Sequence, residues 1–69
     1  MPYNYSKLSG RIDEICGSRS EFARRMGLSE RSISLKMSGK RAWSQKDIAR
    51  ACIVLDISTA EIPAYFFTL

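Results

Sequence analysis

The sequence predicts an all-α fold: a compact bundle of four to five short helices in one domain that spans residues 1–69. Apolar residues recur at helical spacing, and serines followed three residues later by an acidic residue precede several of these stretches. Alternating strand patterns are nearly absent, except at the last few residues. With 45% hydrophobic and 26% charged residues, the chain is too apolar for a disordered tail. Its length leaves room for a single small core.

The first helix is expected over about Ser6–Cys16, where Leu8, Ile12 and Ile15 form an apolar stripe and Gly17 provides a stop. The second helix, about 19–26, begins with a capping box and ends where Gly27 allows a sharp turn. The start and the end of the second helix follow from local chemistry, because a serine hydroxyl satisfies a free backbone N–H and glycine tolerates positive φ.

A third helix is expected over about residues 30–38 after the cap Ser29, with only Ile33 and Met37 as apolar positions one turn apart. The fourth begins after Ser44 and carries a core-facing stripe at i, i+3, i+4 and i+7: Ile48, Ala51, Cys52 and Leu55. A short fifth helix near residues 59–65 follows Ser58, and we expect Pro63 to distort or shorten it.

Several function classes are disfavoured by composition. The chain has no histidine, so it lacks the usual general base, Ser–His or Cys–His pair, and any His-containing zinc site. The neighbouring carboxylates Asp13 and Glu14 point apart on a helix and indicate a solvated face. We therefore expect no enzyme, no metal, no cofactor and no small-molecule ligand.

Cellular location is inferred from the cysteines and the absence of targeting signals. Cys16 and Cys52 fall on apolar helix positions without a C-x-x-C pattern, which favours two buried free thiols over one disulfide. No apolar run is long enough to span a membrane, and the N-terminus lacks the features of a signal peptide. We expect a cytoplasmic protein that does not associate with membranes.

The positive charge is concentrated in one stretch. The whole chain has a net charge of +4, but residues 18–41 hold seven basic residues against two acidic ones, a balance of +5. This stretch also contains the second helix, the Gly27 turn and the third helix, whose thin apolar stripe leaves a free face. Such a face fits the major groove, and neutralising phosphates releases counterions, so the stretch favours duplex DNA as partner.

The same stretch resembles the helix-turn-helix of the phage Cro and lambda-type repressor (Xre-like) family over residues 22–34, FARRMGLSERSIS. Ala23 is similar to the small residue where the two helices touch, Gly27 to the turn glycine, and Leu28 and Ile33 to the two apolar anchors. The resemblance covers about residues 6–62 and implies a lambda-repressor-like DNA-binding domain. The sequence departs from the family at Arg19, where glutamine is frequent, and at Lys36, where many relatives are apolar.

The resemblance implies two sets of DNA contacts. The third helix would be the recognition helix, with base edges contacted by Ser29, Glu30, Arg31, Ser34 and Leu35. Phosphates would be contacted by Ser18, Arg19, Lys36, Lys40 and Arg41. Two of these residues have an alternative interpretation: Glu30 as a charge that stabilises only its own helix N-terminus, and Leu35 as an isolated exposed apolar residue.

The resemblance further implies a two-fold dimer whose recognition helices enter successive major grooves of a palindromic operator. Candidate dimer contacts are the apolar residues off the core stripe and in the C-terminal tail: Ile53, Val54, Phe66, Phe67 and Leu69. The alternative for the tail is that it folds back into the core. The predicted function is a sequence-specific DNA-binding transcriptional regulator, a Cro-like repressor encoded by a phage or prophage. The alternative is a protein-interaction module of the same fold, such as an antitoxin or anti-repressor.

Overall fold

The computed structural model describes residues 3–69, and this range contains five α-helices, one short 3₁₀ turn and no strand. The all-α class predicted from the sequence is confirmed. The elements in chain order are α1 (Ser6–Cys16), α2 (Arg19–Met26), α3 (Glu30–Met37), α4 (Gln45–Leu55), the 3₁₀ turn η1 (Thr59–Glu61) and α5 (Ile62–Phe66).

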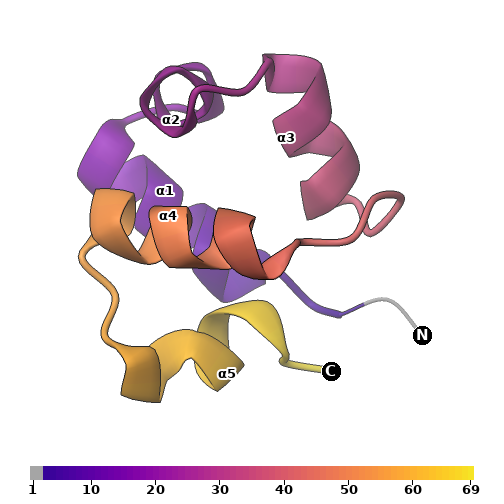
Figure 1. Cartoon of the computed structure of the whole chain (residues 1–69), viewed down its shortest axis with the longest axis vertical. Coiled ribbons are helices and arrows are strands. Elements are labelled where there is room, and N and C mark those ends of the chain that lie inside the picture. The colour runs from indigo at the N-terminus through magenta and orange to yellow at the C-terminus, as the bar shows by residue number, and fades with distance from the viewer. Residues whose placement is uncertain (1–2) are drawn as a thin grey trace.

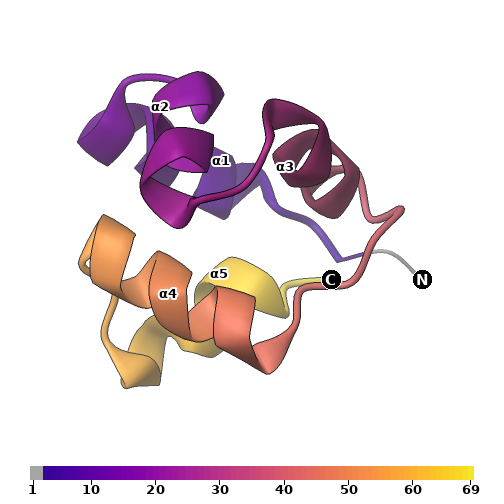
Figure 2. The same ribbon diagram turned by 45° about the horizontal axis from the view of Figure 1, so that its top comes forward.

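Helix α1 holds the bundle together, because it packs against α2, α4 and α5. It lies behind α4 in Figure 1, with α2 and α3 on one side of the pair and α5 on the other. After rotation, α2 and α3 are seen together across from α4 and α5 (Figure 2). The two ends of the described chain meet, since the backbone N–H of Asn4 donates to the carbonyl of Thr68 at 2.6 Å.

The core is formed by apolar side chains from every helix. Leu8 and Ile12 of α1 are fully buried, as are Phe22 of α2 and Leu55 of α4. The remaining buried apolar residues are Ala23, Met26, Ile33, Met37, Ala51, Ile57, Tyr65 and Phe66. Helix α3 contributes only Ile33 and Met37 to the apolar core, and its opposite side, with Glu30, Arg31 and Ser34, is exposed.

Serine caps begin three of the helices. The hydroxyls of Ser18, Ser29 and Ser44 each accept a hydrogen bond, at 3.1 Å, from the backbone N–H three residues later. At the other end, Gly17 and Gly27 adopt positive φ angles of 85° and 72° and close α1 and α2. Local capping chemistry therefore sets where the chain turns, as the sequence indicated.

The segment expected as one distorted helix near residues 59–65 is divided in two. The 3₁₀ turn η1 comes first, and α5 begins only at Ile62, so Pro63 lies in the first helical turn. A proline is well tolerated there, because its missing N–H would have had no intrahelical partner. The Glu61 carboxylate accepts from the backbone N–H and the hydroxyl of Ser58, which lowers the pKa of Glu61.

Phe66, predicted to lie in a dimer interface, is instead a core residue with 1% of its surface exposed. Its ring packs edge-on against Trp43, with centroids 5.2 Å apart. Helix α5 turns Tyr65 and Phe66 inward, whereas Phe67 and Leu69 follow its end and are 48% and 80% exposed. The apolar tail is thus part core and part surface.

A link that the sequence did not reveal joins α1 to the end of α4. The Arg11 guanidinium donates from Nε to the carbonyl of Leu55 at 3.0 Å and from Nη2 to that of Asp56 at 3.3 Å. These carbonyls have no helical partner at a helix C-terminus, so the contact satisfies them and carries a favourable charge.

The two cysteines are free, and both are half-buried rather than fully buried. Burial raises the pKa of the Cys52 thiol. Within residues 3–69, no helix has both the length and the apolar character needed to cross a membrane.

Two glycine substitutions should change stability in opposite directions. In Gly10→Ala, the new methyl meets no atom within 4 Å in the middle of α1, so the free energy of unfolding should rise by about 1 kcal/mol. In Gly27→Ala, the φ of +72° strains any L side chain, and the free energy should fall by about 1–2 kcal/mol. Urea unfolding followed by circular dichroism measures both, and a shift of the same sign in the two variants would contradict these expectations.

Candidate nucleic-acid interface

Helices α2 and α3 and the turn between them form the candidate interface. Gly27 ends α2 in the left-handed conformation, and the backbone N–H of Leu28 returns to the carbonyl of Ala23 at 3.0 Å. Two residues later the Ser29 cap starts α3. Ala23 is 2% exposed, which agrees with a small residue where two helices meet. The sharp turn therefore holds α3 against α2 while only the Ile33–Met37 side is covered.

The predicted base-contact residues share the uncovered side of α3. Ser29, Glu30, Arg31 and Ser34 are exposed, and Leu35 is partly exposed. The Ser29 hydroxyl is occupied as the cap of α3 and also donates to the Ser32 hydroxyl at 3.1 Å. Arg31 and Ser34 form no side-chain hydrogen bond or ion pair with the other residues that the structure describes. These two side chains are consequently the most available for an external partner.

Lys40 and Arg41 lie beside the C-terminal end of α3. The backbone N–H groups of both residues donate to the Leu35 carbonyl, at 3.0 and 3.2 Å. Arg41 also donates from Nη1 to the Ser32 hydroxyl at 3.1 Å. The loop through Gly39, whose φ is 80°, therefore brings two exposed cations next to the uncovered side of α3. Ser32, which the sequence did not single out, links this loop to the start of α3.

Lys36 is a correction to the predicted phosphate contacts. Its side chain is buried, and its ammonium group donates to the Asp47 carboxylate at 2.6 Å and to the Ala42 carbonyl at 3.1 Å. It also lies 5.7 Å from the centre of the Trp43 ring. An ammonium group with these partners is not free to reach DNA. The pair with Lys36 lowers the pKa of the Asp47 carboxyl.

The position of Lys36 contains a signal that explains its burial. It lies three residues after Ile33 and one before Met37, on the same side of α3 as the core. A charged residue on an apolar stripe requires a partner, because an unpaired buried charge is strongly unfavourable. The spacing therefore indicates burial, but it does not identify Asp47, which comes from α4.

At the start of α2, the predicted phosphate contacts Ser18 and Arg19 are both exposed. One turn further along, Glu21 is bound by two guanidinium groups, those of Arg24 and Arg25. The hydrogen bonds from these guanidinium groups lower the pKa of Glu21 to about 2, and the bond from Arg24 has the larger effect. Glu21 therefore stays ionised and neutralises one of the two arginines, which reduces the charge that α2 offers to an anion.

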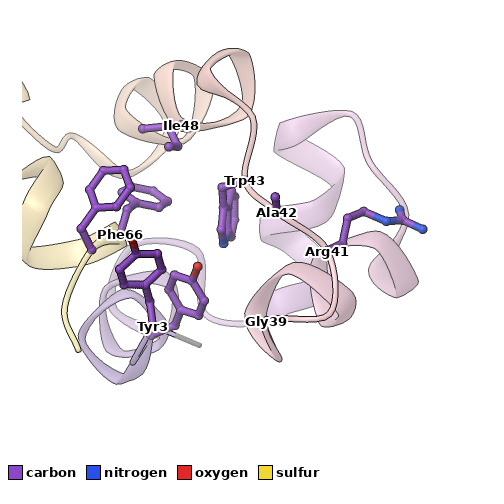
Figure 3. A pocket seen from close by; sticks show the side chains of 9 residues that line it. Tyr3, Gly39, Arg41, Ala42, Trp43, Ile48 and Phe66 are labelled. Atoms are coloured by element: carbon purple, nitrogen blue, oxygen red, sulfur yellow. The ribbon is translucent and has the colours of Figure 1, made fainter. Parts of the chain in front are cut away.

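A hollow of about 250 Å³ adjoins the interface on the side of the aromatic residues. Trp43, Ile48 and Phe66 surround it, together with Tyr3 and Tyr5 from the N-terminal segment (Figure 3). Arg41 lies at its edge, and its guanidinium points away from the aromatic rings (Figure 3). Trp43 is partly buried and packs against the core, whereas Arg41 belongs to the α3 face.

Comparison with known proteins assigns the chain to a family. A family model described as "Protein of unknown function (DUF739)" matches residues 1–69. The chain belongs to the DUF739 family. No curated protein matches it. The fold is similar to the solution structure of the modulator of repression (MOR) of the temperate bacteriophage TP901-1 from Lactococcus lactis. That match has a TM-score of 0.86 and 48% sequence identity, and covers 97% of this chain and 90% of the other.

Neither match is described as a Cro-like or helix-turn-helix protein. Membership of the Cro and lambda-type repressor family therefore stays a prediction. The DNA contacts inferred from it also stay predictions, apart from Lys36, which the structure removes from the set.

Removing one partner of the Lys36–Asp47 pair should destabilise the fold. In Asp47→Asn the buried ammonium loses its counter-charge, and we expect the free energy of unfolding to fall by about 2–3 kcal/mol. The control Glu14→Gln removes a partner of Arg11 that is 63% exposed, and should cost less than about 1 kcal/mol. Equal losses in the two variants would show that burial does not strengthen the first pair.

The same pair predicts a dependence on acid. Because its pKa is lower in the folded than in the unfolded chain, Asp47 contributes stability that is complete above its ordinary pKa of 3.8. This contribution is lost as the pH falls further, toward the folded pKa. The difference in unfolding free energy between the wild type and Asp47→Asn should therefore shrink below about pH 4. A constant difference down to the acid limit of folding would contradict this prediction.

Proposed function

We propose that this chain is a phage-encoded regulator that binds duplex DNA in a sequence-specific manner and acts on transcription as a Cro-like repressor in the host cytoplasm. The single observation that carries the proposal is the uncovered face of α3, where Arg31 and Ser34 are exposed without a partner among residues 3–69. An α-helix with such a face fits the major groove, and an arginine can pair bidentately with guanine.

The surroundings of that face support the proposal. Lys40 and Arg41 lie at one end of α3, and Ser18 and Arg19 lie at the start of α2. Cations and free helix N–H groups at these places suit the phosphates that flank a base-reading helix. The similar TP901-1 protein is named a modulator of repression, which favours a regulatory role in a phage.

We propose a two-fold dimer on a palindromic operator, since one domain of this size reads few base pairs. Phe67 and Leu69 are the tail residues suited to this contact, because both side chains remain exposed. Tyr3 stacks edge-on against Phe67, with centroids 5.5 Å apart, and so belongs to the same surface.

A protein-interaction module of the same fold, such as an antitoxin or anti-repressor, is the alternative. It is favoured by the exposed apolar side chains, of which Ile53 and Leu69 are 83% and 80% exposed. A modulator of repression, as the similar phage protein is named, is compatible with either function. The salt dependence of binding to duplex DNA distinguishes the two functions. The DNA affinity of a DNA-binding protein falls steeply as the salt concentration rises, whereas a protein-interaction module would not bind duplex DNA in this salt-dependent way.

The test of DNA reading uses Arg31→Ala. Selection of bound sequences from a random duplex pool would first give the operator, and affinities would then be measured on it and on single base-pair variants. We expect a loss of about 1–3 kcal/mol that is confined to one base pair. Arg24→Ala is the matched control: that arginine is exposed but engaged by Glu21, so its loss should be small and independent of sequence.

Two results would count against the proposal. If the pool yields no enriched sequence and no salt-dependent binding, the chain does not act on DNA by itself. If Arg31→Ala weakens binding equally to the operator and to random duplex, α3 does not read bases.

A further inference from the structure

The outer face of α4 carries an apolar surface that the DNA-binding proposal does not use. A hollow of about 400 Å³ lies between α4 and the end of α2, and we call its lining the α2–α4 patch: Arg25, Lys46, Ala49, Arg50, Ile53 and Val54. Ile53 is 83% exposed although it lies inside an 11-residue helix. Ile53 adjoins Ala49 and Val54 in this lining, and an apolar surface rimmed by polar residues is typical of an interaction site.

Helical spacing produces this patch. Lys46, Ala49, Arg50 and Ile53 follow one another at i, i+3, i+4 and i+7, so they share one face of α4. The core-facing residues Ala51 and Leu55 occupy another face. The small side chain of Ala49 leaves room between its larger neighbours, which gives a shallow groove along the helix.

Every charged residue in the lining is a cation. Within residues 3–69, Lys46 and Arg50 form no ion pair, while Arg25 shares the Glu21 carboxylate with Arg24. The neighbouring carboxylate of Asp47 is drawn inward to Lys36. The patch therefore combines an apolar centre with positive charge that the chain itself does not neutralise.

Arg50 has a defined place at the edge of the patch. Its Nη1 atom lies 3.8 Å from the point where a Cβ on Gly27 would stand, so the guanidinium lies beside the end of α2. The partial negative charge at a helix C-terminus favours a cation there. This placement keeps the charge next to the groove.

We infer that the α2–α4 patch is a docking surface for an amphipathic helix of another protein, one whose apolar stripe is flanked by acidic residues. The stripe would cover Ile53 and Val54 in the groove, and the flanking carboxylates would pair with Lys46 and Arg50. The patch shares no residue with the proposed DNA contacts, so its role does not depend on DNA binding.

A second copy of this chain fits the patch poorly. Across a two-fold axis the same surface would face itself, and Lys46, Arg50 and Arg25 would meet their own positive charges. Duplex DNA also fits poorly, since phosphates offer no apolar group to cover Ile53. Ile53 and Val54 therefore belong to a contact with an acidic partner rather than to the predicted dimer interface.

The experiment is a titration of the ¹⁵N-labelled full chain with a synthetic amphipathic peptide of about 18 residues, long enough to form several helical turns. Leucines at i, i+3, i+4 and i+7 form its stripe, and glutamates flank them. The control peptide has lysine in place of every glutamate. We expect the acidic peptide to shift the resonances of Ala49, Arg50, Ile53 and Val54 with a Kd below about 1 mM, and the basic peptide to leave them unchanged.

Variants of the chain test which groups carry the binding. Ile53→Asp should weaken binding of the acidic peptide at least about tenfold, and the double variant Lys46→Glu with Arg50→Glu should do the same. Ala60→Asp is the matched control, because Ala60 is also an exposed apolar residue but lies outside the patch and outside the proposed DNA and dimer contacts, and the Kd of this variant should match the wild type. Circular dichroism checks the helical fold of each variant. If Ile53→Asp fails to fold, the double variant of Lys46 and Arg50 tests whether the patch binds the acidic peptide.

Several results would overturn the inference. These are no binding of the acidic peptide, equal binding of the two peptides, or shifts centred away from the patch. Self-association of the wild type that Ile53→Asp abolishes in sedimentation would make the patch a dimer interface. Duplex DNA binding that the Lys46 and Arg50 variant abolishes, with peptide binding intact, would assign the cations to DNA.

Discussion

The ion pair between buried Lys36 and half-buried Asp47 joins α3 to α4, and the orientation of the candidate interface depends on this contact. Helix α3 gives only Ile33 and Met37 to the apolar core, so packing alone holds it along a narrow line. The Lys36 ammonium joins it to the first turn of α4 through Asp47 and to the preceding loop through the Ala42 carbonyl. A directional polar contact thus supplies the orientation that a thin apolar stripe cannot, and leaves the opposite side of α3 exposed.

Helix α4 makes three different kinds of contact. Its inner face supplies Ala51 and Leu55 to the core, its first turn holds Lys36, and its outer face presents Ile53 between cations. Because Asp47 is paired with Lys36, the outer face keeps a net positive charge. The ion pair that orients the proposed DNA-reading helix is therefore also a reason why the α2–α4 patch suits an acidic partner. The two proposed surfaces are linked through a single carboxylate.

Local chemistry made much of the fold predictable. The caps Ser18, Ser29 and Ser44 and the turn residues Gly17 and Gly27 act within a few residues of themselves, and each is found in its expected role. The uncovered side of α3 also follows from the sequence, because two apolar residues one turn apart cannot cover a whole helix. The contact of Arg11 with the Leu55 and Asp56 carbonyls was not predicted, because it joins residues more than forty positions apart and no local sequence pattern encodes it.

The sequence by itself determined the helical class, the helix ends and the concentration of positive charge in residues 18–41, since these depend on neighbours along the chain. Only the tertiary structure decided how individual charges and apolar groups are used. Lys36 is withdrawn into an ion pair, Phe66 enters the core, and Ile53 remains on the surface. The physical reason is that burial and counter-charge come from residues distant in sequence, and composition does not specify which of them meet.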